Sequence, residues 1–111
     1  MTYIVGPGDL LETKLFTKLV QEYLSDDEYA VLQQSLIVNP EAGDVIPGSG
    51  GVRKLRCGVA GRGKRGGIRV IYFLRLRRDE IWMLTLYAKN VADNIPAKML
   101  KKIKEEIDAE G

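Results

Sequence analysis

The sequence predicts a compact α+β fold in which an antiparallel sheet of about four strands carries two N-terminal helices and one C-terminal helix. Apolar residues recur at helical spacing through residues 11–37, gather in β-prone runs between residues 52 and 88, and return to helical spacing near the C-terminus. The expected element order is β-α-α-β-β-β-α. With 111 residues, the chain is long enough for one core, so we expect a single domain over residues 1–111.

The N-terminal segment predicts a brief strand followed by a helix. Residues 2–5 are β-prone, and Gly6, Pro7 and Gly8 end that run. Apolar residues three and four positions apart then form one stripe, which predicts the first helix. The stripe consists of Leu11, Leu15, Phe16, Leu19, Val20, Tyr23 and Leu24.

A capping box predicts the start of the second helix. Ser25 can accept a hydrogen bond from the Glu28 amide, while the Glu28 side chain reaches back to the Ser25 amide. The expected buried stripe of this helix is Tyr29, Leu32, Leu36 and Ile37. Asn39 precedes a proline, which predicts the end of the helix there.

The second half predicts three neighbouring antiparallel strands and a final helix. Residues 43–51 hold four glycines and a proline, so we expect a loop. Strands are expected at residues 52–57, 68–76 and 81–88, joined by a hairpin tip at 58–67 and a short turn at 77–80. Asp93 or Asn94 can cap the last helix, with Pro96 in its first turn. Its expected apolar stripe is Ile95, Met99, Ile103 and Ile107.

Alternation along the predicted strands assigns their faces. Ile68, Val70, Tyr72 and Leu74 are all apolar and are expected to face the helices, so Arg69 falls on the other face. By the same alternation Lys54 and Arg56 oppose Arg53, Leu55 and Cys57 in the preceding strand, and we expect the first pair beside Arg69. We expect all helices on one face and a partly open, cationic second face.

Charge is distributed very unevenly along the chain. Residues 52–78 contain ten Lys or Arg and no acidic residue, whereas residues 1–51 contain two Lys against eight carboxylates. A basic stripe on a small domain attracts phosphate chains even where the net charge is only +2. This pattern indicates a nucleic-acid partner, since uncompensated like charges repel one another until a polyanion binds.

Several classes of chemistry are excluded or made unusual by the composition. The chain has no histidine and one cysteine, so it offers neither a Cys/His zinc set nor a Cys–His nucleophile pair, and Cys57 is expected to be a small packing residue. Gly63 and Lys64 fit part of a P-loop, but Arg65 replaces its hydroxyl and a strand follows, so that motif is rejected. No signal peptide or membrane-spanning run is evident, and a cytoplasmic location with no membrane partner is expected.

Three segments resemble a known family when they are taken together. They are residues 50–56 (GGVRKLR), 63–72 (GKRGGIRVIY) and 84–90 (LTLYAKN), with further similarity at 44–48 (DVIPG) and 23–29. In this combination the chain resembles the RelE/HigB group of bacterial toxin–antitoxin toxins, within the RelE/ParE superfamily. The resemblance implies a ribosome-dependent mRNA endoribonuclease that cuts mRNA in the ribosomal A site and inhibits translation. Its implied partners are a cognate antitoxin, the 70S ribosome with mRNA, and ribosomal RNA.

The same resemblance implies which residues carry the activity. The family keeps a basic cluster on the sheet face, and Arg69 occupies the best-matched position, with Lys54 and Arg56 on the preceding strand. Attack by the 2′-hydroxyl builds charge on the scissile phosphate, which fixed cations stabilise without a metal or other cofactor. Tyr87, near the end of the last strand, can donate its phenol proton or stack on a base. Ribosomal RNA contacts are expected from Arg53, Arg62, Lys64, Arg65 and Lys89.

The chain departs from the family pattern after the last strand. RelE carries an arginine there and a tyrosine in its C-terminal helix, and residues 90–97 contain neither. Lys89 and Tyr87 are the nearest substitutes for proton transfer. Two alternatives therefore stay open, a ParE-like poison of DNA gyrase and a non-catalytic RNA-binding module.

Overall fold

A computed structural model describes residues 3–4, 10–58, 67–88 and 95–109 of the chain. The strands are β1 (Tyr3–Ile4), β2 (Leu10–Glu12), β3 (Asp44–Val45), β4 (Arg53–Cys57), β5 (Ile68–Arg75) and β6 (Glu80–Ala88). The helices are α1 (Lys14–Tyr23), α2 (Asp26–Val38) and α3 (Ala97–Ala109), and a 3-10 turn, Leu76–Arg78, joins β5 to β6. None of the described helices combines the length and apolarity needed to cross a membrane.

The described strands form one mixed sheet in the order β1-β2-β6-β5-β4-β3. The three predicted neighbours, β4, β5 and β6, are antiparallel as expected. Two further strands were missed by the prediction of about four. β2 pairs in parallel with β6, and β3 forms a two-residue edge within the expected loop. Leu11 was assigned to a helix because it lies four residues before Leu15, yet it pairs with Trp82 as a strand residue.

Helix α1 begins at a threonine that also ties it to the sheet. The Thr13 hydroxyl accepts from the Phe16 amide at 3.1 Å and donates to the Leu84 carbonyl at 2.8 Å. The Thr13 amide donates to the Met83 carbonyl at 3.1 Å. Leu15 belongs to the predicted apolar stripe, but its side chain is exposed on the solvent side of α1.

Helix α2 has the predicted start and end. The Glu28 amide donates to the Ser25 hydroxyl at 3.1 Å, and the Ser25 amide donates to the Glu28 carboxylate at 2.8 Å. Asn39 caps the other end of the helix. Leu32 and Leu36 are buried as expected, but Ile37 is exposed.

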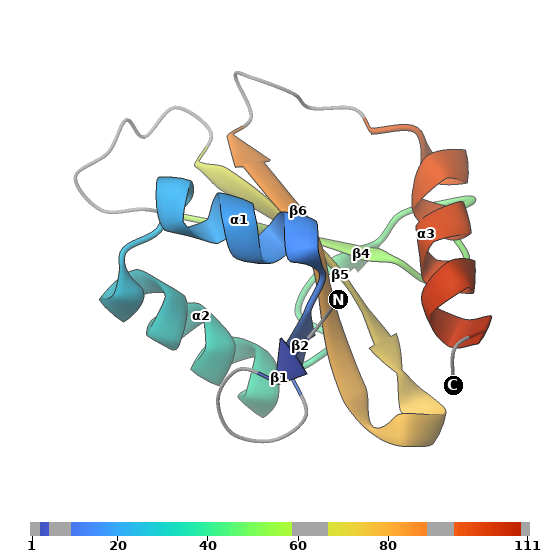
Figure 1. Ribbon diagram of the computed structural model, residues 1–111, viewed down its shortest axis with the longest axis horizontal. Coiled ribbons are helices and arrows are strands. Elements are labelled where there is room, and N and C mark those ends of the chain that lie inside the picture. Colours follow the sequence, from blue (N-terminus) through green and yellow to red (C-terminus); the bar gives the residue numbers. More distant parts are fainter. Residues whose placement is uncertain (1–2, 5–9, 59–66, 89–94, 110–111) are drawn as a thin grey trace.

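Helices cover both faces of the sheet, so the expectation of an open second face is wrong (Figure 1). On one face, α1 and α2 pack against Ile68, Val70 and Tyr72 as predicted, and together they form the first core cluster. On the other face, Leu100 of α3 joins a second cluster with Ile71 and Phe73. The prediction of an open face was wrong because it treated the second face of β5 as cationic. Ile71 and Phe73 lie between the two arginines of that face and are apolar.

The position of α3 explains one further error in the predicted core. Leu100 is the buried residue of this helix, whereas Met99 is exposed. Ile103 and Ile107 contribute to the second cluster as expected. Pro96 precedes the helix, and its carbonyl accepts from the amides of residues 99 and 100 at 3.0 and 3.3 Å.

A carboxylate is buried where β2 meets both N-terminal helices. Glu12 is only 3% exposed and accepts hydrogen bonds from the hydroxyls of Thr17 and Tyr29, both at 2.5 Å. Burial, together with this carboxylate, raises the pKa of Tyr29. These bonds satisfy the carboxylate and connect β2 to both N-terminal helices, which offsets part of the cost of burying it.

Tyr72 holds the segment after α2 against the sheet. Its hydroxyl donates to the Pro40 carbonyl at 2.7 Å and accepts from the Gly43 amide at 2.9 Å. A Cβ atom at Gly43 would lie 3.0 Å from the Tyr72 ring and hydroxyl, so the chain passes closely here because this residue is glycine. Arg53 completes the contact by donating to the Gly43 carbonyl at 2.7 Å.

We expect Tyr72→Phe to lower the free energy of unfolding at pH 7 by about 1–3 kcal/mol, because a buried amide and a carbonyl lose their partner. Urea unfolding monitored by tryptophan fluorescence measures this difference. Leu76→Ala, at an exposed position, is the control and should change stability by less than about 0.5 kcal/mol. Equal effects of the two substitutions would contradict the assigned role of the hydroxyl.

The same tyrosine predicts a loss of stability in alkali. Burial raises the pKa of Tyr72 above its ordinary value of 10.0, although the Gly43 amide and Arg53 act in the opposite direction. The folded state therefore keeps the phenol proton to a higher pH than the unfolded state, so the stabilisation is complete below pH 10 and is lost as pH rises further. In unfolding series from pH 8 to above 10, Tyr72→Phe should lose less stability than the wild type.

Candidate nucleic-acid interface

Three predicted site residues form one row across the central strands. Arg56 of β4 is paired with Arg69 of β5, and Arg69 is paired with Tyr87 of β6. Directly opposed residues in an antiparallel sheet project from the same face, with Cβ atoms about 5 Å apart. The register thus brings two guanidinium groups and one phenol together on the α3 face of the sheet. We call Arg56, Arg69 and Tyr87 the cross-strand row.

Lys54 lies one same-face position along β4 from Arg56. It is paired with Ile71, which is paired with Thr85. The predicted placement of Lys54 and Arg56 on the face of Arg69 is therefore confirmed. All four predicted catalytic residues, Lys54, Arg56, Arg69 and Tyr87, project from one face.

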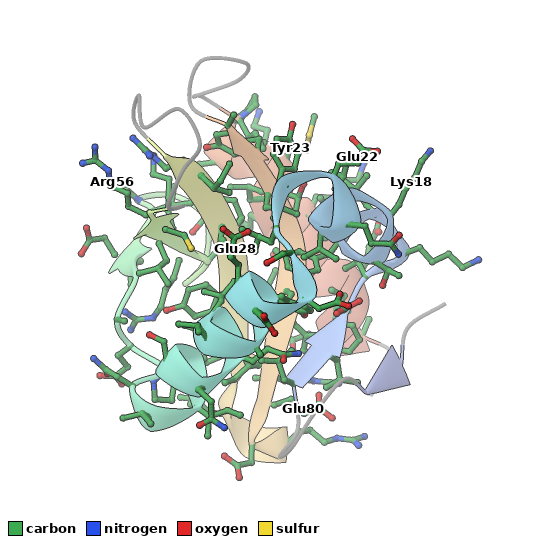
Figure 2. All side chains as sticks on the ribbon, turned by 90° about the vertical axis from the view of Figure 1, so that its left-hand side faces the viewer. Lys18, Glu22, Tyr23, Glu28, Arg56 and Glu80 are labelled. Carbon is green, nitrogen blue, oxygen red and sulfur yellow. The ribbon has the colours of Figure 1, made fainter. Side chains whose placement is uncertain are left out.

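Exposure differs sharply within this group. Arg56 is exposed and projects from the β4 side of the sheet, away from α1 and α2 (Figure 2). Lys54 is half-buried. Arg69 and Tyr87 are only 8% and 7% exposed, and both have interaction partners. The row therefore has an accessible end at Arg56 and an inner end whose side chains are held in place.

The start of β5 depends on a close approach to β4. Gly67 has a φ of 63°, and a Cβ atom there would lie 2.8 Å from the Cys57 carbonyl. Glycine adopts this left-handed conformation without steric cost. Gly67 thereby lets β5 enter the sheet beside β4, two residues before Arg69.

The cross-strand row carries positive charge. Among the described residues, Arg56 and Lys54 form no ion pair with a carboxylate. Arg56 and Arg69 lie directly opposite one another on neighbouring strands. An anion beside both guanidinium groups would form charge-assisted hydrogen bonds with them.

A second buried arginine on the same strand has a different environment. Arg75 donates to Glu80 at 3.3 Å and to the Asp108 carbonyl at 3.2 Å, and its Nε lies 3.2 Å from the Asp108 carboxylate without an aligned hydrogen bond. Glu80 also accepts from the Trp82 indole at 3.0 Å. Arg75 thus connects the C-terminal part of α3 to the far end of β5. No sequence motif predicts this role of Arg75, although its spacing from Arg69 places both arginines on one face.

Arg53 differs from the other cations of its strand. It is paired with Tyr72 and projects toward the opposite face from Lys54 and Arg56. Its guanidinium donates to the carbonyls of Glu41 and Gly43 at 3.2 and 2.7 Å. Through these bonds Arg53 holds the segment after α2 against the sheet. The other predicted RNA contacts, Arg62, Lys64, Arg65 and Lys89, lie outside the described residues, as do Asp93 and Asn94.

Among the described residues, neither Cys57 nor the acidic side chains form a second reactive or metal-binding site. Cys57 is half-buried and packs against the first cluster as predicted, and burial followed by the charge of Glu28 raises the pKa of its thiol. A protonated thiol is a poor nucleophile. Within the described part of the chain, no group of three or more His, Cys, Asp or Glu side chains could hold a metal ion.

The arrangement suits the binding of a phosphodiester. Arginine presents planar donors that match two phosphate oxygens, and a partly buried guanidinium acts in a medium of lower dielectric than water. The phenol at the end of the row supplies a hydroxyl that can donate a proton or a hydrogen bond. Cations and a phenol around one phosphate are sufficient parts for transition-state stabilisation in RNA cleavage.

A match to a family profile identifies the class of protein to which the chain belongs. The profile of the family described as "RelE toxin of RelE / RelB toxin-antitoxin system" matches residues 10–108. Because the match spans most of the sequence, the chain belongs to the RelE toxin family, which confirms the resemblance. It is accordingly the toxin of a toxin–antitoxin system, with a cognate antitoxin as its partner.

A solved structure agrees with this assignment at the level of the fold. The chain is similar to the E. coli toxin RelE, solved in the free state with two arginine-to-alanine substitutions. The TM-score is 0.58 at 14% sequence identity, and the match covers 88% of this chain and 96% of that chain. The predicted α+β class, with two N-terminal helices and one C-terminal helix, is thus confirmed.

We expect Arg75→Leu to lower the free energy of unfolding by about 2–3 kcal/mol, because Glu80 and Asp108 would face an apolar side chain. Amide hydrogen exchange should also accelerate selectively in α3. Lys104→Leu is the matched control, since Lys104 forms only a partly exposed pair with Asp108 at 3.4 Å and should cost less than about 1 kcal/mol. Uniform acceleration throughout the protein would contradict an anchoring role specific to α3.

Proposed function

We propose that this protein is a ribosome-dependent mRNA endoribonuclease that cuts messages in the ribosomal A site and so arrests translation. The cross-strand row is the observation that carries the proposal. Two guanidinium groups and a phenol on one face of the sheet match the donors that a phosphodiester needs, whereas a protein that acts only through protein contacts needs no such set. Ribosomes and mRNA would be its working partners, and the cytoplasm its location.

The proposed reaction is an in-line displacement within the RNA. The 2′-oxygen of one nucleotide loses its proton and forms a bond to the adjacent phosphorus. The bond from that phosphorus to the 5′-oxygen of the next nucleotide breaks, and this oxygen gains a proton. The phosphate gains negative charge and a fifth oxygen in the transition state, so fixed cations stabilise that state more than the ground state.

We assign the two arginines to the phosphate. Arg69, held by its surroundings, would present a pre-oriented guanidinium that needs little reorganisation during the reaction. Arg56, at the exposed end of the row, would close on the same phosphate from the solvent side. Lys54, one same-face position along β4 from Arg56, would add positive charge beside them.

We assign Tyr87 to the leaving group. Its place beside Arg69 puts a phenol within the same row, and the matching stretch after β6 lacks the arginine typical of RelE. The phenol would donate its proton to the departing 5′-oxygen. Arg62, Lys64, Arg65 and Lys89 would grip ribosomal RNA, where each phosphate contact contributes affinity that falls with salt. Arg53 is left out of this set because its guanidinium is bound to backbone carbonyls.

We expect Arg69→Ala and Arg56→Ala each to reduce cleavage about 100-fold or more, since each removes an oriented donor from the transition state. Primer extension on a defined message in a reconstituted translation reaction, with and without ribosomes, measures the cleavage. Arg78→Ala is the matched control, because Arg78 is an exposed arginine after the opposite end of β5. It should cleave at close to the wild-type rate.

Primer extension, together with a gyrase supercoiling assay and an RNA-binding assay at varied salt, separates the alternatives. Cuts that require ribosomes and depend on Arg69 support the proposal. Intact message together with inhibited gyrase supercoiling would replace it with the ParE-like function. Intact message with salt-dependent RNA binding would replace it with the non-catalytic binding module.

Tyr87→Phe should slow cleavage about 100-fold or more while ribosome binding is preserved, because the ring remains and only the proton donor is lost. Tyr23→Phe on α1 serves as the control. An unchanged rate in Tyr87→Phe would reduce this tyrosine to a packing or stacking role.

A further inference from the structure

The solvent-facing side of α2 is apolar. After the acidic first turn, the helix contains no charged residue through Val38. Ala30, Val31, Gln34, Ile37 and Val38 are all exposed, and their spacing places them on one side, opposite the buried Leu32 and Leu36. Val31 and Val38 are 71% and 80% exposed. We call these five exposed residues the α2 outer face.

The neighbouring helix shows how unusual this face is. The exposed positions of α1 include Lys14, Lys18, Gln21 and Glu22, and Figure 2 shows Lys18 and Glu22 reaching into solvent. A surface helix normally carries such polar residues opposite its buried stripe, whereas a helix that is apolar on both sides is covered by something. Nothing among the described residues covers the α2 outer face.

The apolar surface continues into a groove at the end of α2. Ile37 and Pro40 line a cavity of about 400 Å³ together with Leu74 and Leu76. Leu76 is 81% exposed. The groove thus extends the α2 outer face onto the turn between β5 and β6. One continuous apolar surface runs from Ala30 to that turn, on the side of the sheet opposite the cross-strand row.

Acidic groups lie at both ends of this surface. Asp26 and Asp27 are exposed in the first turn of α2. At the other end Glu41 and Asp79 line the groove, as does Glu80, whose carboxylate is bound to Arg75 and Trp82. In Figure 2, which looks onto this side, Glu28 marks the first end and Glu80 the second. The apolar surface therefore has negative charge at both of its ends.

We propose that the α2 outer face and its groove dock an amphipathic helical segment of another polypeptide, with apolar residues along one side and Lys or Arg at both ends. Apolar burial would supply the affinity, and the terminal cations would pair with the acidic ends. The segment needs about 13 residues to follow α2, which at 1.5 Å per residue is about 20 Å long. The inference is independent of the proposed cleavage activity.

A second copy of this chain does not fit as the occupant. A two-fold axis pairs the same patch with itself. Parallel α2 helices would then bring Asp26 and Asp27 against their own copies, and antiparallel helices would bring them against Glu41 and Asp79. Either arrangement places like charges at both ends of the contact.

Two synthetic peptides of 18 residues test the proposal on the full-length protein. Both carry the same leucine stripe, and one has three lysines at each end where the other has three glutamates. Titration followed by amide NMR shifts should show the lysine-ended peptide binding at least about tenfold more tightly than the glutamate-ended peptide. The largest shifts should fall on α2 and residues 74–81.

Matched variants locate the binding surface. Val31→Lys combined with Val38→Lys should weaken the lysine-ended peptide at least about tenfold. Leu15→Lys combined with Gln21→Lys adds the same charge to the exposed side of α1 and should leave binding within about twofold of wild type. Circular dichroism and thermal unfolding confirm that both double variants are folded before binding is compared.

Several outcomes would overturn the proposal. These are equal binding of the two peptides, no binding of either up to about 1 mM, and equal weakening by the two double variants. A wild-type dimer in sedimentation velocity that V31K/V38K abolishes would instead make a second copy the occupant. Cleavage is measured separately: selective peptide binding by a protein that cuts no message would leave the docking surface standing while the proposed function fails.

Discussion

The register of β5 between β4 and β6 is the constraint on which the rest of the structure depends. Both faces of this strand are buried, one by α1 and α2 and the other partly by α3. A slip of one residue would exchange the two faces, placing Arg69 and Arg75 among the residues that pack against α1 and α2. The register is therefore strongly specified, and the cross-strand row follows from it. An irregularity between Ile71 and Tyr72 lets both Leu84 and Tyr87 of β6 reach the α3 face.

Two buried arginines on this one strand show how position alone separates roles. Arg75 lies where α3 and the β5–β6 turn supply carboxylates, so its charge is paired and serves to hold the last helix. Arg69 lies where the neighbouring strand supplies another arginine. Residue type does not distinguish the two, but the cross-strand neighbour does. Two guanidinium groups that face one another across neighbouring strands have the donors that match a phosphate.

Sequence reasoning succeeded where a short-range pattern decides the outcome. The capping box at Ser25 and Glu28 depends on residues three apart, and the inward set of Ile68, Val70 and Tyr72 depends on alternation within one strand. It failed where distant partners decide. Leu10–Glu12 is a strand only because β6, about 70 residues later, offers an edge, and its spacing from Leu15 fits a helix equally well. The choice of Leu100 over Met99 depends likewise on where α3 meets the sheet.

The parallel pairing of β2 with β6 has a consequence for the order in which the chain can fold during synthesis. Of the described strands β6 is the last to be made, yet it lies between β5 and β2, and the Thr13 amide and hydroxyl bind the carbonyls of Met83 and Leu84. Contacts separated by some 70 residues in sequence are slow to form, because a long loop must close first. Residues 10–38 can form helices early but have no sheet to pack on until residue 88 has left the ribosome. The nascent chain thus completes both its core and its cross-strand row only after β6 has been made.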